Sequence, residues 1–527
     1  MIDILIRNGL IIDGTGNPGF YGTVAVTGDE VHIIRGDTSN LEANRVIDAS
    51  EHVVSPGFID VHSHGGLVIL GEPRHEPKVR QGITTELIGV DGNSVAPFKS
   101  QEDLHRFIEF DSGLNGKPPM PAEWSTVAEY LSMYDNKVAV NICYILGNAP
   151  VRIWSIGWND QPSTVKQLED MKSVVREAME EGACGLSTGL DYPPGSYADT
   201  NELIELSKVV AEKGGIYHTH TRRSLRKNGL LGPWEEALDI GRGSGVPVHL
   251  THYRQSNQGD GSHLDYINLV ENARNEGMDV TFDCYPYVYS STRAIISIPN
   301  WTKDGGPDRL KKALMSSEDR ARMREEMESG TTIMGSRASD SSLTGFLKPH
   351  NKQYEGYTLA EIARMRKQDD LEAFFDLLLE EDLGLCIVGI GTNPQTLPAF
   401  VSHPYGMVGS DAILVGEYPA PRTYGCFPVI LAEFVRAEKH LRLSEAIRKM
   451  TSFPAQRLGL KDRGILNDGM KADIVVFNPN TVKATSTQRN PKQFPIGIPY
   501  VIVNGQVVID NCEHTGALPG RALRHGR

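Results

Sequence analysis

The chain has 527 residues, of which 39% are hydrophobic and 23% charged, as in an ordinary soluble globular protein. A net charge of -14 without a basic stripe argues against nucleic acid as a partner, because nothing would neutralise its phosphates. No run of about 18 apolar residues occurs, so no membrane span is expected. The six cysteines are scattered without a CxxC pair, which favours a reduced, cytoplasmic setting.

The two ends of the chain share a pattern of short strands separated by turn signals. The first 55 residues contain IDILIRNG, GTVAVTGDEVHII and RVIDA, and the last segment contains ADIVVFNP and IPYVIVNGQVVID. We therefore expect residues 1–55 and 465–527 to form one composite β-sandwich.

The centre, residues 56–464, alternates short apolar runs with helical patterns, which are clearest at 164–181, 201–213 and 264–276. Eight runs are candidate strands: 57–64, 83–90, 138–146, 183–188, 215–220, 247–252, 279–287 and 406–411. Eight strands alternating with helices predict an α/β fold of the (β/α)8, TIM-like barrel type. We interpret residues 292–400, between strands seven and eight, as an insertion that caps the barrel mouth.

The most informative stretch is PGFIDVHSHG at residues 56–65, an apolar run that ends in His62 and His64. Residues two apart on a strand point to the same side, so both imidazoles can meet one ion. Four more polar residues end a predicted strand or, in one case, directly follow it, where barrel enzymes carry their chemistry. They are Asp91, His220, His252 and Asp411.

Four imidazoles and two carboxylates at one rim predict one or two divalent ions of the zinc, manganese or nickel kind. Such an ion lowers the pKa of a bound water from 15.7 to about 7. A carboxylate beside that water can pass its proton to a leaving nitrogen, and Asp411 is the candidate for this general acid/base role. His75, His218 and His249 are interpreted as ordinary core or rim residues, with His249 pointing away from His252.

Several motifs together resemble the amidohydrolase superfamily and, more narrowly, its D-aminoacylase (N-acyl-D-amino-acid deacylase) branch. The similarity covers nearly the whole chain and is weakest between residues 295 and 400. The motifs are PGFIDVHSH (56–64), THTR (219–222), LTHYR (250–254), DCYPY (283–287), GSD (409–411), PRTYGCFP (421–428), MTSFPAQRLGL (450–460) and TGALPGR (515–521).

The resemblance implies a tight metal site made by His220, His252 and the residue after strand two, with zinc as the first expectation. His62 and His64 would hold a second, weaker ion, and Asp411 would be the general acid/base.

In the family a cysteine follows strand two, whereas this chain carries Asp91. A carboxylate is a harder ligand than a thiolate and has two oxygens, so it could bridge two ions. The alternative is a plain turn role for Asp91 before Gly92. A second departure is Asn148, where the family tends to carry a histidine after strand three.

The resemblance also implies how a substrate carboxylate is held. A basic residue after strand six would grip it together with a Tyr and a Ser after strand seven, and the matching positions are Arg254, Tyr285 and Ser291. An arginine offers a planar two-donor fork that suits a carboxylate. A rim ion pair is the alternative role for Arg254.

The leading hypothesis is a metal-dependent hydrolase that cleaves the C–N amide bond of an N-acyl-D-amino acid or a related N-acyl compound. Its substrate would be a small molecule with a free carboxylate. A cyclic amide or imide ring opener is the second hypothesis, and a catalytically inactive scaffold is the third. The acyl group, the substrate's chirality and the oligomeric state, a homo-oligomer included, stay open.

Overall fold

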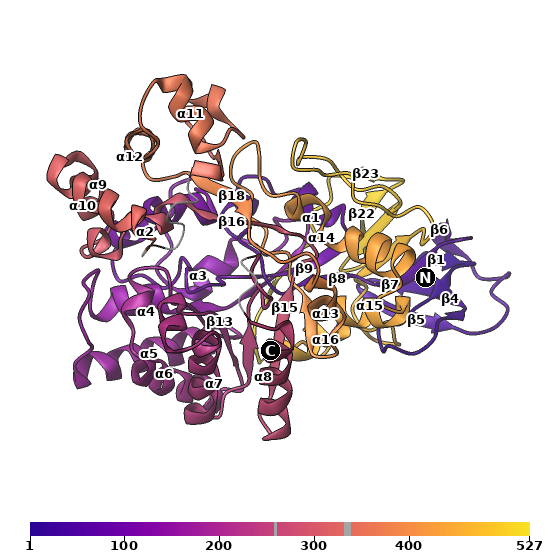
Figure 1. The fold of residues 1–527 in the computed structure, drawn as a ribbon. Helices are drawn as coiled ribbons and strands as arrows, with labels where there is room; N and C mark the ends of the chain where they lie inside the picture. The colour runs from indigo at the N-terminus through magenta and orange to yellow at the C-terminus, as the bar shows by residue number, and fades with distance from the viewer. Residues whose placement is uncertain (258–260, 331, 333–338, 527) are drawn as a thin grey trace.

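The computed structural model describes residues 1–257, 261–330, 332 and 339–526 (Figure 1). At its centre are the eight parallel barrel strands that the sequence predicts, the third of them in two pieces. They are β8 (Phe58–Asp60), β9 (Ile83–Ile88), β10 (Asn141–Tyr144) with β11 (Leu146–Gly147), β12 (Gly185–Gly189), β13 (Ile216–His220), β14 (Val248–Leu250), β15 (Val280–Cys284) and β19 (Gly406–Val408).

Helices lie between the barrel strands along the chain. Those before β15 are α1 (Glu76–Val79), α2 (Gln101–Asn115), α3 (Val127–Ser132), α4 (Asn148–Ser155), α5 (Val165–Glu181), α6 (Thr200–Glu212), α7 (Gly232–Ser244) and α8 (His263–Asn275). Those around and after β19 are α13 (Leu397–Ser402), α14 (Arg422–Val429), the π-helical η8 (Ile430–Ala437), α15 (Leu443–Met450) and α16 (Ser452–Arg457).

Helix α5 shows how the sequence specifies these elements. Thr164 and Gln167 form a capping box at its start, and Gly182 ends it with a positive φ. Its buried residues recur at helical spacing, so one face packs on the barrel: Met171, Val174, Val175, Ala178 and Met179.

The barrel closes where its first and last strands meet. The backbone N–H of Asp411 donates to the carbonyl of His62 at 2.8 Å, and that of His64 donates to the carbonyl of Ala412 at 3.0 Å. A parallel bridge between Ser63 and Ala412 joins the same two segments. This closure places Asp411 beside both histidines.

Several barrel strands end earlier than expected, β9, β15 and β19 among them. β8 ends at Asp60 and β14 at Leu250, so His62, His64 and His252 lie beyond strands rather than on them. The carboxylate of Asp60 accepts the backbone N–H of His62 at 3.2 Å. Beyond β8, the backbone bonds of His62 and His64 flank the bridge at Ser63, and both imidazoles lie in one group, in agreement with the expected same-side placement.

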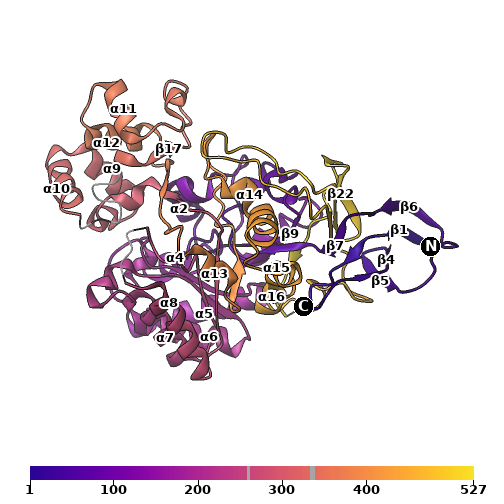
Figure 2. The same cartoon turned by 45° about the vertical axis from the view of Figure 1, so that its right-hand side comes forward.

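Between β15 and β19 the chain forms a separate lobe. Its strands β16 (Tyr289–Arg293) and β17 (Ser342–Thr344) pair antiparallel with β18 (Cys386–Ile390). In Figures 1 and 2 its helices gather at the end of the molecule opposite the N-terminal strands. They are α9 (Pro307–Met315), α10 (Ser317–Glu328), α11 (Leu359–Arg366) and α12 (Asp370–Glu380).

Both ends of the chain build the predicted β-sandwich. One sheet has the order β5-β4-β1-β6 and the other β23-β22-β21-β20-β7-β2-β3, so strands from both termini pair. The bounds are β1 (Ile2–Arg7), β2 (Leu10–Ile11), β3 (Phe20–Tyr21), β4 (Thr23–Thr27), β5 (Glu30–Ile34), β6 (Ala43–Asp48), β7 (Val53–Pro56), β20 (Ile474–Phe477), β21 (Tyr500–Val503), β22 (Gln506–Asp510) and β23 (Glu513–His514).

The C-terminal tail leaves the sandwich and returns to the barrel. Its strand β24 (Ala522–Leu523) pairs in parallel with β10. The domain boundaries near residues 55 and 465 therefore stay predictions. In the part of the chain that the structure describes, no helix is long and apolar enough to cross a membrane.

A buried ion network supports the barrel closure from below. Lys78 is fully buried and its ammonium contacts Asp60, Glu86 at 2.8 Å and the Ser410 hydroxyl at 2.9 Å. Asp60 also accepts the backbone N–H of Ser410 at 2.8 Å. One cation thus holds together the segments that carry His62 and Asp411.

Replacing Lys78 by Met should destabilise the fold strongly, because two buried carboxylates would lose their cation. We expect a loss of about 3–5 kcal/mol, the usual cost of breaking a buried ion pair. Lys492→Met is the matched control, since its partner Glu417 is 58% exposed, and it should cost less than about 1 kcal/mol. Urea unfolding measures both, and equal midpoints would refute the role of Lys78.

Candidate metal centre

Six side chains predicted from the sequence converge at the ends of the barrel strands or just beyond them, and they form two groups that share Asp91. Oδ2 of Asp91 lies 3.5 Å from His62 Nε2 and 3.8 Å from His64 Nε2. The same oxygen lies 3.6 Å from His220 Nδ1 and 3.8 Å from His252 Nε2. One carboxylate oxygen is therefore the common neighbour of all four imidazoles.

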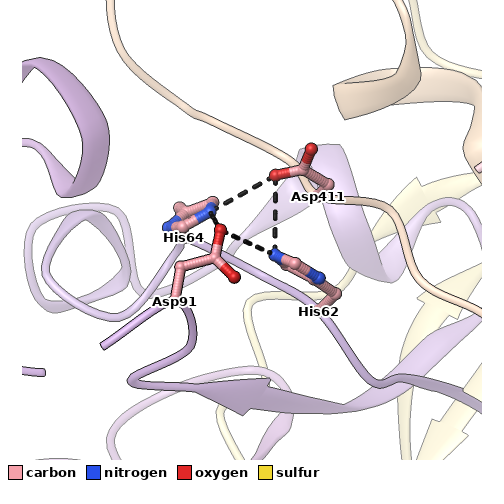
Figure 3. Close-up of side chains that lie close together, drawn as sticks. All are labelled: His62, His64, Asp91 and Asp411. Carbon is pink, nitrogen blue, oxygen red and sulfur yellow. Dashed lines mark ion pairs between the residues drawn. The ribbon is translucent and has the colours of Figure 1, made fainter. Parts of the chain in front are cut away.

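Asp411 stands at the His62 and His64 side of the centre (Figure 3). Its Oδ1 lies 3.6 Å from His62 Nε2 and 3.3 Å from His64 Nε2. Both Nε2 atoms are buried and have no hydrogen-bond partner among the described residues. Buried nitrogens left unpaired beside two carboxylates fit a divalent cation, because imidazole and carboxylate are common ligands of zinc.

Three residues of the centre have a left-handed backbone. The φ angles are 54° at Asp91, 37° at His252 and 47° at Asp411. Such conformations are uncommon outside glycine, cost about 1–3 kcal/mol each and cluster at functional sites. Here each occurs just after a barrel strand and turns a polar side chain toward the same point.

Three of the imidazoles are held from behind by an oxygen. His62 Nδ1 contacts Asp283 at 3.3 Å, and His64 Nδ1 contacts the amide oxygen of Asn115 at 3.1 Å. His220 Nε2 contacts Asp191 at 3.0 Å. Metal-binding histidines usually have such partners, which orient the ring and keep the inner nitrogen unprotonated.

The sequence analysis missed these outer partners. Asp191 follows β12 in LDYPPG, so the strand-end rule could have found it. Asp283 lies inside the DCYPY motif, yet nothing there identifies it as a partner of His62. Asn115 is the last residue of α2, more than twenty residues past β9, and no sequence signal links it to His64.

The three histidines interpreted from the sequence as core or rim residues, His75, His218 and His249, are all buried. His249 contacts Asp283 at 3.1 Å and Thr281 at 2.8 Å, and its ring stacks on His218 at 5.0 Å. His218 and Asp283 also lie close enough to His62 to form a deeper group, fully buried below the centre. His75 pairs with Glu86 at 2.9 Å in the core.

The two carboxyl groups of the centre are ionised. Burial opposes ionisation, but the charge of His62 and hydrogen bonds from His220 and His252 hold the pKa of Asp91 well below its usual value. Burial likewise opposes ionisation of Asp411, and the guanidinium of Arg422 lowers the pKa of that carboxyl. Arg422 Nη2 lies 2.8 Å from Asp411 Oδ2, which leaves Oδ1 free to face the imidazoles.

Nearby carboxylates raise the pKa of two of the imidazoles. Burial opposes protonation of His62, yet Asp91 and Asp283 raise its pKa well above the usual range. Burial also opposes protonation of His220, and hydrogen bonds to Asp191 and Asp91 raise its pKa to about 9. Without a bound cation, protons on these rings balance the buried carboxylates.

Two of the three expected carboxylate-binding residues lie together. The Arg254 guanidinium stacks over the Tyr285 ring at 4.3 Å, and its Nη1 donates to the carbonyl of His252 at 2.6 Å. Nη2 contacts the hydroxyl of Ser290 at 3.1 Å, not that of Ser291. Adjacent residues of β16 face opposite sides, and the Ser291 hydroxyl is buried with no hydrogen bond among the described residues.

Asn148, the other departure from the family pattern, begins α4 next to the loop that carries Asp91 and Gly92. Its Nδ2 donates to the carbonyl of Gly195 at 2.9 Å, while its Oδ1 is buried without a partner in the described chain. The structure gives it no contact with the four imidazoles of the centre.

Asp91 should determine how many ions the protein holds. We expect about two zinc ions per chain in excess metal and about one in Asp91→Ala, because the shared oxygen would be gone. Asp91→Cys should bind a single zinc tightly, since a thiolate with two imidazoles suits that ion. Metal analysis after gel filtration measures the counts, and identical counts in all three proteins would show that Asp91 is no ligand.

Comparisons with known proteins identify the family of the chain. The sequence model of the amidohydrolase family matches residues 332–509. The D-aminoacylase of Alcaligenes xylosoxydans xylosoxydans is 32% identical over 523 residues, which cover 99% of this chain and 97% of that protein.

Two solved structures share the fold over their full length. A crystal structure of D-aminoacylase matches with a TM-score of 0.82 and 28% identity, covering 100% of both chains. N-acyl-D-glutamate deacylase from Bordetella bronchiseptica, in complex with zinc and a phosphonate inhibitor, matches with a TM-score of 0.82 and 29% identity, covering 99% of both. The chain therefore belongs to the amidohydrolase family of metal-dependent enzymes acting on C–N bonds, in its D-aminoacylase branch.

Proposed function

We propose that the protein hydrolyses the amide bond of an N-acyl-D-amino acid or a close N-acyl relative. One observation carries this proposal: the guanidinium of Arg254 lies directly beside the metal centre, bonded to the carbonyl of His252. A carboxylate held by Arg254 would bring the adjacent amide group to the centre. The relatives named D-aminoacylase and N-acyl-D-glutamate deacylase support the same substrate class.

We assign the metal ligands from the two groups that share Asp91. His220, His252 and Asp91 would hold one ion, and His62 and His64 would hold a second. Zinc is the proposed metal, because imidazole and carboxylate suit it and a relative was solved with zinc. When bound, such an ion supplies an acidified water and polarises the scissile carbonyl.

Asp411 would move the proton. Its Oδ2 is fixed by Arg422, so Oδ1 can accept a proton from the attacking water. The water oxygen adds to the acyl carbon, and the same carboxyl then gives its proton to the nitrogen as the C–N bond breaks. Because Arg422 keeps the pKa of Asp411 low, the carboxyl is ionised at neutral pH and returns the proton readily.

Arg254 and Tyr285 would position the substrate. The Arg254 guanidinium donates hydrogen bonds to His252, Ser290 and Thr392, and these bonds fix it in place. The Tyr285 ring lies between two guanidiniums, Arg254 at 4.3 Å and Arg422 at 4.2 Å. Two cations on one aromatic ring make this side of the centre attractive to an anion.

Asp411→Asn tests the proton role, because the amide keeps the shape but cannot accept the proton. We expect kcat to fall by a factor of about 100 or more, with bound zinc unchanged. Steady-state kinetics and metal analysis of the same preparation measure the two quantities. Near-normal kcat would assign the proton transfer to another group.

Arg254→Met tests the substrate class. With N-acetyl-D-amino acids KM should rise by a factor of about 10–100, the value of a hydrogen bond to a charged group, while Arg254→Lys should keep part of the affinity. The wild type should prefer D over L substrates and leave cyclic imides intact. Turnover of a cyclic imide that is insensitive to Arg254→Met would instead favour the ring opener.

A further inference from the structure

The last turn of α2 lies behind the metal centre and carries two buried polar residues. Asp111 and Asn115 are four residues apart, so they share one face of the helix. Asp111 is 1% exposed and Asn115 is 9% exposed. The Asn115 amide touches His64 on one side and Asp111 on the other, and this contact makes the pair part of the site.

Hydrogen bonding allows only one orientation of the Asn115 amide. Its Nδ2 donates to the carbonyl of Asn93 at 3.1 Å and to the carboxylate of Asp111. Turning the amide over would set its oxygen against these two acceptors. Oδ1 therefore faces His64 Nδ1 at 3.1 Å, and since an amide oxygen only accepts, Nδ1 must carry the hydrogen.

This arrangement leaves the lone pair on the other ring nitrogen of His64. Its Nε2 is buried without a partner among the described residues and faces the carboxylates of Asp411 and Asp91. A neutral imidazole binds a metal only through its unprotonated nitrogen. Asn115 thus presents His64 in the tautomer that a metal needs at this position.

The lobe between β15 and β19 holds this pair in place. Arg293, the last residue of β16, is 1% exposed and its Nη1 lies 2.7 Å from Asp111 Oδ1. The same guanidinium stacks over the Tyr192 ring at 4.7 Å, and that ring lies 4.8 Å from the ring of His220. One residue of the lobe therefore touches neighbours of both halves of the centre.

We propose that Asn115 is a positioning residue that sets the tautomer and direction of His64 for metal binding. Asp111 and Arg293 hold Asn115 in that orientation, so the first strand of the lobe contributes to metal affinity. This inference rests on the metal centre proposed above.

Zinc affinity, measured without substrate by competition with a chromophoric chelator, tests the proposal. In Asn115→Leu the weaker zinc should bind about 10–100-fold less tightly, the usual effect of removing such an outer partner. Asp111→Asn should weaken zinc in the same direction. Glu202→Gln is the matched control, because Glu202 is also a buried carboxylate paired with a buried arginine, Arg152 at 2.6 Å, and it should leave zinc affinity unchanged.

Exchanging the two side chains separates positioning from general damage. Asn115→Asp alone sets two carboxylates against each other and should weaken zinc. Adding Asp111→Asn places an amide N–H donor next to the new carboxylate at position 115, which faces His64. The double variant should therefore recover zinc affinity. This comparison also decides the matter if Asn115→Leu does not fold.

The outcomes distinguish this inference from the proposed function. A wild type that binds no zinc would overturn both. A wild type that binds zinc, with Asn115→Leu binding it equally well, would overturn only the role of Asn115. The role of Asn115 would also be refuted if the double variant lost as much zinc affinity as Asn115→Asp alone. The double variant restores the hydrogen-bond pattern around His64, so the proposal requires it to bind zinc more tightly.

Discussion

The arrangement of polar side chains at the strand ends of this barrel depends on a single buried carboxylate oxygen. Asp91 is 2% exposed, and its Oδ2 lies within 3.8 Å of a nitrogen from each of four imidazoles. A buried negative charge is costly unless positive charge compensates it. Protons on the imidazoles can do so in the isolated chain. In the proposed metal-bound state, divalent ions would replace these protons as the compensating positive charge.

The barrel brings these groups together through its closure and through partners outside the ring of strands. Backbone hydrogen bonds between the segments of His62 and Asp411 fix two sides of the centre, and buried Lys78 holds those segments from below. Oxygens from Asp283, from helix α2 and from the loop after β12 then orient the rings. The positions of the imidazoles are therefore determined both by the strand ends and by elements that are distant in sequence.

Apolar runs alternating with helical patterns were enough to predict the eight strands. Strand-end position then predicted that the six polar residues converge, because barrel strands all end at one rim. Prediction from sequence failed for features that depend on the local backbone conformation. The left-handed φ angles of Asp91, His252 and Asp411 could not be assigned from sequence, because Asp and His adopt this conformation only in a small fraction of cases. Nor could the sequence show that Ser290 contacts Arg254, because the face of β16 on which each hydroxyl lies depends on how that strand is placed. Contacts of Asn115 depend on tertiary packing alone.

Anomalous diffraction at the zinc edge from crystals of the metal-loaded protein tests the central claim most directly. The account predicts a peak at about 2.0–2.2 Å from Asp91 Oδ2, the usual zinc–carboxylate distance, with imidazole nitrogens completing the shell. A zinc peak bound elsewhere, with Asp91 only hydrogen bonded to the imidazoles, would contradict it.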